Sequence, residues 1–180
     1  MINSPLIIGC GTLGSSLALN LAKKNLVSKL TIYDFDIVSS GSNESIYPFK
    51  SYESGIPKVK IIKFMCRKIN PDMVVVAHEE RVSQSIDTND FIIDCRDCKT
   101  IKINSRLKLS LDGHLLYIDS SKNYSSGKNY HKYMYSKDPG FIESAVTTIT
   151  NYLVNDDYFY PQLRLYDIKK SENYILYSEK

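Results

Sequence analysis

The chain has 180 residues, of which 43% are hydrophobic, and its formal net charge is +3 at pH 7. This length and composition are sufficient for a single compact domain over residues 1–180, with a full core and no need for disulfides or a structural metal. No apolar run is long enough to span a membrane, and the basic residues are scattered, so we expect no membrane and no nucleic-acid partner. With 14 tyrosines, no tryptophan and many Asn, Lys and Ile residues, the chain suggests an AT-rich genome such as that of a phage, a virus or a low-GC bacterium. We therefore expect a cytoplasmic protein, in the cytoplasm of a host if the source is viral.

The first predicted elements form a unit of strand, glycine turn and helix. Apolar residues 6–8 predict a buried strand, and periodic apolar residues predict a helix near residues 13–24. The turn between them has the pattern G-x-G-x-x-G, and its candidate ligand-binding residues are Gly9, Gly11, Thr12, Leu13 and Gly14. Glycines let the backbone approach a nucleotide's phosphates, and the free N–H groups and positive dipole end of the helix favour anions. The unit predicts a nucleotide site, and the simpler alternative is a tight turn alone.

An acidic residue follows the second predicted strand, which covers residues 30–33. Asp34 lies twenty residues beyond Gly14, at the tip of that strand. A carboxylate in this place can accept hydrogen bonds from ribose hydroxyls, so the spacing strengthens the interpretation of the glycines. The glycine turn and Asp34 together do not distinguish an NAD-binding site from an ATP-binding site.

Four further motifs follow in a fixed succession that an NAD-binding domain does not need. They are Asp34-Phe35-Asp36-Ile37-Val38, Gly55-Ile56-Pro57-Lys58-Val59, Ile69-Asn70-Pro71 and Asp94-Cys95-Arg96-Asp97. Over nearly its whole length, the chain resembles the ThiF/MoeB/HesA family, the adenylating domain shared with ubiquitin-activating enzymes. This resemblance implies ATP and Mg²⁺ as cofactors. It also implies the adenylation of a carboxylate, commonly the terminal glycine of a ubiquitin-fold protein.

The resemblance also assigns roles to individual residues. Lys58, at the start of a helix, would bring a positive charge to the phosphates, and Asp97 would bind Mg²⁺, which prefers carboxylate and phosphate oxygens. These two are the candidate catalytic residues. The other expected nucleotide-binding residues outside the glycine turn are Asp34, Asp36, Asn43 and Asp94, of which Asp36 and Asp94 are expected to orient the turns around the site.

One family motif is incomplete. Where the family has N-L-x-R-Q, residues 41–46 read G-S-N-E-S-I, so Asn43 matches only after a shift of one residue. No basic residue lies between Lys29 and Lys50, so the arginine that would stabilise charge on the phosphates is missing. Two functions follow. One is an adenylyltransferase for a protein or peptide carboxyl terminus, completed by a partner that supplies an arginine. The other is a non-catalytic pseudoenzyme that sequesters a nucleotide, a ubiquitin-fold protein or an activating enzyme.

The whole pattern predicts an α/β, Rossmann-like, doubly wound fold with a mostly parallel sheet. The expected parallel strands are residues 6–8, 30–33, 73–77, 91–94 and 115–119, and the expected helices lie near residues 13–24, 58–69 and 99–110. Residues 120–139 replace the family's long crossover loop with a shorter polar segment that has no cysteine, which excludes a thioester cysteine there.

The last third of the chain predicts a helix and a β-hairpin. Residues 141–153 carry apolar residues at helical spacing, namely Ile142, Ala145, Ile149 and Leu153. We expect this stripe, together with the hairpin of residues 162–178, to form a homodimer interface or a heterodimer interface with a related activating enzyme, the alternative being that the stripe covers the chain's own sheet. Residues 162–168 and 173–178 alternate apolar and polar side chains around a polar turn, which predicts a C-terminal hairpin.

Overall fold

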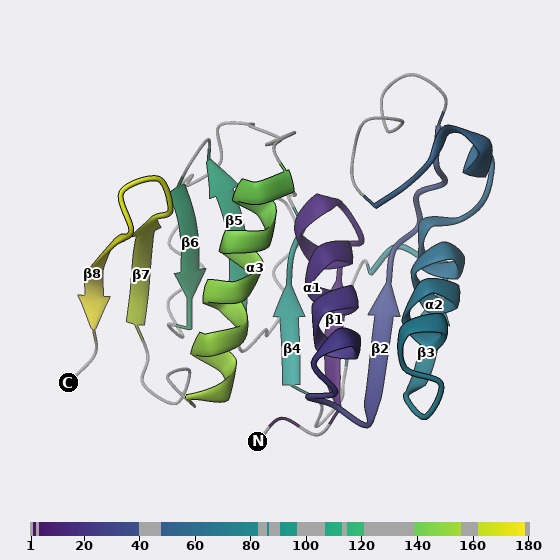
Figure 1. The fold of residues 1–180 in the computed structure, drawn as a ribbon, viewed down its shortest axis with the longest axis horizontal. Coiled ribbons are helices and arrows are strands. Elements are labelled where there is room, and N and C mark those ends of the chain that lie inside the picture. Colours follow the sequence, from purple (N-terminus) through teal and green to yellow (C-terminus); the bar gives the residue numbers. More distant parts are fainter. Residues whose placement is uncertain are drawn as a thin grey trace.

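The computed structural model describes residues 2, 4–39, 48–82, 86, 91–96, 107–112, 115–120, 139–155 and 162–178. These residues form one mixed sheet of eight strands in the order β3-β2-β1-β4-β5-β6-β7-β8. The described helices α1, α2 and α3 lie side by side over one face of the sheet (Figure 1). The predicted α/β fold class is therefore confirmed.

The N-terminal half of the sheet is parallel. Its strands are β1 (Pro5–Ile8), β2 (Lys29–Tyr33), β3 (Val74–His78), β4 (Phe91–Asp94) and β5 (Leu107–Asp112). Helix α1 (Thr12–Lys23) connects β1 to β2, and helix α2 (Lys58–Ile69) connects β2 to β3. The predicted elements up to β4 agree with these bounds to within one residue at each end. Because the strands are parallel, their carboxyl ends meet at one edge, where ligands of open α/β sheets bind.

The expected helix over residues 99–110 is wrong for residues 107–110, which belong to β5, whereas residues 99–106 lie outside the described part. Leu107 and Leu109 pack into the helix-covered core, and the intervening Lys108 points to the opposite face, as in any strand. Strand β6 (Leu115–Asp119) pairs with β5 in the antiparallel sense, so its expected parallel orientation is also wrong. Only two residues separate β5 from β6, whereas a parallel pair needs a crossover of a dozen or more residues.

The C-terminal helix and hairpin form as expected. Helix α3 (Pro139–Val154) is followed by the antiparallel strands β7 (Gln162–Asp167) and β8 (Glu172–Ser178), and β7 pairs with β6. The predicted dimerisation stripe is not a free surface. It is buried within the chain's own core, where α3 packs beside α1; its residues are Ile142, Ala145, Ile149 and Leu153. The alternative, that the stripe covers this chain's own sheet, is the correct one.

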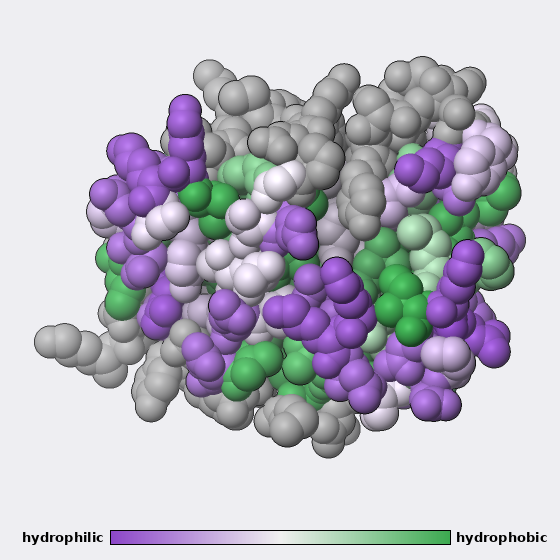
Figure 2. Space-filling view, viewed as in Figure 1, coloured by the Kyte–Doolittle hydropathy of each residue, from purple (hydrophilic) through white to green (hydrophobic). Residues whose placement is uncertain are grey.

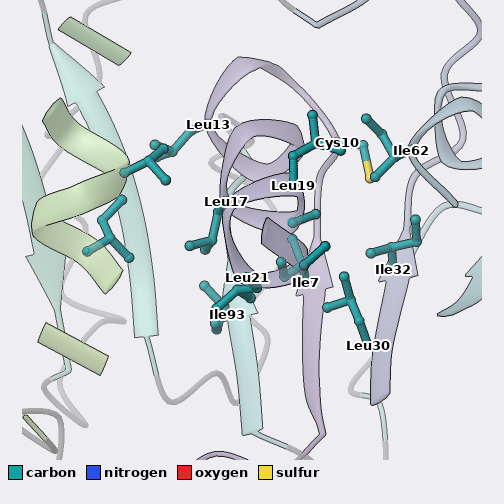
Figure 3. Close-up of a cluster of buried hydrophobic side chains, with 14 of the residues drawn as sticks. Ile7, Cys10, Leu13, Leu17, Leu19, Leu21, Leu30, Ile32, Ile62 and Ile93 are labelled. Atoms are coloured by element: carbon teal, nitrogen blue, oxygen red, sulfur yellow. The ribbon is translucent and has the colours of Figure 1, made fainter. Parts of the chain in front are cut away.

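The main core lies between the sheet and the helices (Figure 3). Ile7, Ile32 and Ile93 come from three neighbouring strands and point toward the helical layer, with Ile7 and Ile93 near Leu21 of α1 and Ile32 on the side of Ile62 of α2. The outer surface of the helical layer is largely hydrophilic, with smaller hydrophobic areas (Figure 2). Among the described residues, each helix falls short of the length and hydrophobicity that crossing a membrane requires.

Candidate nucleotide-binding site

The glycine turn lies at the carboxyl edge of the sheet, between β1 and α1. Gly9 has a φ of +93°, which a residue with a side chain rarely adopts. A Cβ atom on Gly14 would lie 1.9 Å from the Gly9 carbonyl oxygen, so only glycine lets α1 pack this closely on the turn. At Gly11, by contrast, a Cβ atom would meet nothing within 4 Å. The backbone at Gly11 is therefore open to an incoming group.

The start of α1 suits an anion. Gly11 is the N-cap and makes no side-chain cap, and the first turn holds no acidic residue. The first N–H groups of a helix have no partner within it and carry the positive end of its dipole. The buried hydroxyl oxygens of Thr12 and Ser16 have no hydrogen-bond partner among the described residues. The free backbone N–H groups at the start of α1 fit the phosphate oxygens of a nucleotide.

Asp34 lies directly beside this turn, as its position after β2 predicted. Its Oδ2 accepts a hydrogen bond from the Cys10 N–H at 2.5 Å, and its Oδ1 accepts one from the Asp36 N–H at 2.8 Å. Burial raises the pKa of Asp34 above 3.8, and these two bonds and the charge of Lys58 offset that effect only in part. A carboxylate oxygen has two lone pairs, so each can still accept a ribose hydroxyl. The ribose role itself stays a prediction.

Lys58 is held at the same edge by Asp36. The Lys58 Nζ lies 2.9 Å from Asp36 Oδ2, and the Lys58 N–H donates to the Asp36 carbonyl at 3.0 Å. An isolated bridge between Ile37 and Pro57 joins the two segments, and Pro57 is the N-cap of α2. Lys58 is 6% exposed. The chain thus places a buried ammonium group next to the strand end that carries Asp34.

Asp94 is the centre of a buried ionic cluster at the end of β4. Its Oδ1 accepts bonds from the Arg96 N–H and Nε, both at 3.0 Å, and its Oδ2 from Arg96 Nη2 and Lys108 Nζ, both at 3.1 Å. Burial acts to raise the pKa of Asp94, but the hydrogen bond from Arg96 and the charge of Lys108 outweigh it and lower that pKa below 3.8. Asp94 thus binds the turn that follows β4, and its expected role in orienting a nucleotide site stays a prediction.

Sequence reasoning missed Arg96 and Lys108. In the sequence, Lys108 is only one of the scattered basic residues, yet it is 3% exposed. The alternation of Leu107, Lys108, Leu109 and Ser110 is the signal that could have placed it in a strand. Arg96 is the unspecified residue of the D-C-x-D motif, and only the pairing of β1 with β4 shows that it reaches Gly9.

The remaining expected site residues are not placed. Asp97, the expected Mg²⁺ ligand, and Asn43 lie outside the described residues. Within the described ranges, no group of three or more His, Cys, Asp or Glu residues could hold a metal. Cys10 lies within the glycine turn and is buried, whereas Cys95 follows β4 and is partly buried; burial raises the pKa of both thiols, to about 12 for Cys95. Both act as small packing residues; Figure 3 shows Cys10 beside Ile62 of α2.

Comparison with known proteins agrees with this geometry. Residues 3–110 match the sequence model of the ThiF family. A molybdopterin-synthase adenylyltransferase of Haemophilus influenzae is 30% identical over 107 residues, which cover 57% of this chain and 43% of that protein. The chain therefore spans less than half the length of this relative.

Solved structures share the fold over almost the whole chain. A selenomethionine form of PaaA has a TM-score of 0.70 at 16% identity, covering 99% of this chain and 65% of that one. Escherichia coli MccB in complex with MccA has a TM-score of 0.70 at 10% identity, covering 99% and 64%. MccB with ATP has a TM-score of 0.63 at 12% identity, covering 96% and 63%. The family match spans more than half of this sequence, and the chain belongs to the ThiF family.

Proposed function

We propose that this chain binds ATP with Mg²⁺ and acts as an adenylyltransferase on the carboxyl terminus of a protein or peptide. The observation that carries the proposal is the meeting of three features at one sheet edge: the open backbone at Gly11, the carboxylate of Asp34 and the buried ammonium of Lys58. The name of the Haemophilus relative and the complexes of MccB with ATP and with MccA support it.

The reaction needs no covalent enzyme group. A substrate carboxylate oxygen forms a bond to the α-phosphorus of ATP, the bond from that phosphorus to the bridging oxygen breaks, and pyrophosphate leaves. The task of the protein is to orient the reactants and offset the phosphate charge. The N–H groups at the start of α1 and the Lys58 ammonium would bind the phosphates, and Asp34 would orient the ribose. Asp97 is the residue that would hold Mg²⁺, which when bound neutralises further charge on the phosphates.

The charge on the transferred phosphate also calls for a guanidinium group. Arg96 lies beside the glycine turn, but Asp94 binds its Nε and Nη2, and its Nη1 donates to the Val82 carbonyl at 3.4 Å. We propose that a partner, a related activating enzyme, supplies the arginine. The engagement of Arg96 also favours the second candidate, a pseudoenzyme that binds a nucleotide without turnover.

Exchange of pyrophosphate into ATP separates the two candidates. The isolated chain should show very weak exchange with any carboxylate substrate, because loss of a transition-state arginine lowers phosphoryl-transfer rates by about 10³-fold or more. An active pair should recover exchange when the arginine-bearing partner is added, and Asp97→Ala should abolish it again. Binding of ATP without exchange under every combination would favour the pseudoenzyme. Rapid exchange by the isolated chain would show that another residue replaces the arginine, with Lys50 the first to test.

A further inference from the structure

Lys108 is a buried charge in the middle of the sheet. It lies on β5, between β4 and β6, and is 3% exposed. Its neighbours across the two strand pairings are Asp94 and Asp119, and its Nζ lies 3.1 Å from Asp94 Oδ2. Removing an ammonium group and its partner from water is unfavourable, and an apolar residue of similar size is often at least as good for stability. The presence of this lysine therefore calls for a role other than packing.

A second bond shows what Lys108 holds. Its Nζ donates to the carbonyl oxygen of Arg96 at 2.5 Å. That carbonyl belongs to the peptide bond that leads to Asp97, the expected Mg²⁺ ligand. Asp94 in turn accepts bonds from the Arg96 N–H and guanidinium group. Lys108 thus binds both ends of the turn formed by residues 94–96.

This turn packs directly against the glycine turn. The Cγ and N atoms of Arg96 lie 3.0 and 3.1 Å from where a Cβ atom of Gly9 would be, and Cys95 Cβ lies 3.2 Å from the corresponding position at Gly14. The Cys95 N–H also donates to the Ile8 carbonyl at 2.8 Å. There is no room for residues 94–96 to move toward α1 without displacing these two glycines.

We propose that Lys108 is a positioning residue of the nucleotide site. It fixes the turn of residues 94–96. Through that turn it determines the position of the glycine-turn backbone, where the phosphates would bind. It also determines the position of the peptide bond before Asp97. It acts through Arg96 and Asp94, and it needs no contact with the nucleotide. This inference rests on the proposed ATP-binding function.

Three variants test the role by calorimetry with ATP and Mg²⁺, at a temperature where circular dichroism shows each to be folded. Lys108→Met removes the charge and both bonds, and its affinity should fall about tenfold or more, as for other groups that orient ligands indirectly. Lys108→Arg keeps a cationic donor and should recover most of the affinity. Leu109→Ala, at the 1% exposed neighbour on β5, should lower the melting temperature and leave the affinity unchanged.

The outcomes separate this inference from the function on which it rests. Wild-type affinity in a folded Lys108→Met variant would overturn the role of Lys108 and leave ATP binding intact. Failure of the wild-type chain to bind ATP with Mg²⁺ would overturn both. If Lys108→Met does not fold, the NMR signal of the Lys108 ammonium group in the wild-type protein decides. The signal should shift when ATP and Mg²⁺ are added, and an unchanged signal would refute the coupling.

Discussion

Lys58 and Asp36 are joined twice, once through their side chains and once through the backbone. The Lys58 Nζ lies 2.9 Å from Asp36 Oδ2, and the Lys58 N–H donates to the Asp36 carbonyl. Asp36 is about half exposed while Lys58 is buried, so the aspartate holds the ammonium group in place from the solvent side. The lysine is thereby oriented before any nucleotide binds, which lowers the entropy that binding must remove.

Replacing Lys58 should therefore weaken ATP binding more than it weakens the fold. We expect Lys58→Met to lose about 1.5–3 kcal/mol of affinity for ATP with Mg²⁺, the range for a hydrogen bond to a charged group. Lys60→Met is the matched control, because Lys60 lies on the same helix, is 62% exposed and pairs with Glu79 at the surface. Calorimetry on both variants checks this. Equal losses for the two would show that only the overall positive charge of α2 matters.

The glycine turn offers a pair of substitutions with opposite outcomes. Gly11→Ala should leave the free energy of unfolding nearly unchanged, because Gly11 has a φ of −71° and its Cβ position is empty. The same substitution should weaken ATP binding, because it places a methyl group in the path of the phosphates. Gly14→Ala should destabilise the fold by at least about 2 kcal/mol, because its Cβ atom would overlap the Gly9 carbonyl.

Urea unfolding and calorimetry together check this pair. Unchanged ATP affinity in a stable Gly11→Ala protein would mean that no phosphate approaches this backbone. Unchanged stability of Gly14→Ala would contradict the close packing of α1 on the turn.

Acid should weaken nucleotide binding before it unfolds the chain. The pKa of Asp34 is raised by burial, so Asp34 protonates at a higher pH than an ordinary aspartate and then loses acceptor capacity for ribose. Because the pKa of Asp34 is higher in the folded chain than in the unfolded chain, protonation of Asp34 stabilises the folded state. Asp94 has a lowered pKa, so its contribution to stability is present above pH 3.8 and is lost only as the pH falls through its value in the fold.

A pH series of calorimetry and circular dichroism measures the two effects separately. The affinity should fall at mildly acidic pH while the circular dichroism signal stays constant. An Asp34→Asn variant should lack this step in affinity. Loss of binding and of folded structure at the same pH would contradict the opposite shifts of the two carboxyl groups.

The apolar stripe of α3 should act on stability rather than on association. Ile149 is fully buried in the core, so Ile149→Ala should lower the free energy of unfolding by about 2–5 kcal/mol. Val154→Ala, at the 57% exposed end of the same helix, should change it by less than about 0.5 kcal/mol. Neither should alter the sedimentation coefficient. If Ile149→Ala dissociated an oligomer with its stability intact, the stripe would be an interface after all.

Much of the parallel half of the fold was predictable because its signals are local. Short apolar runs predicted β1 to β4, apolar residues at helical spacing predicted the crossover helix α1, and motif spacing identified Asp34 and Lys58. Residues 107–110 fall within the expected helix over residues 99–110, although the alternation of Leu107, Lys108, Leu109 and Ser110 is that of a strand. The burial of Lys108 depends on Asp94 and Arg96, which only the pairing of β4 with β5 brings to it. Such non-local contacts cannot be read from spacing along the chain.

The pairing of Asp36 with Lys58 has the same origin. The two residues are 22 positions apart, and the bridge between Ile37 and Pro57 brings their segments together. The sequence predicted both as site residues from family motifs, but not that one holds the other.

Titration calorimetry of the isolated chain with ATP and Mg²⁺, and separately with NAD, tests the central claim most directly. We expect the chain to bind ATP with Mg²⁺ in preference to NAD, because the buried ammonium of Lys58 next to the open glycine turn suits a triphosphate. Binding should weaken when Mg²⁺ is removed or Asp97 is replaced by Ala. Equal or stronger affinity for NAD, or an Asp97→Ala variant that responds to Mg²⁺ as the wild type does, would contradict the account.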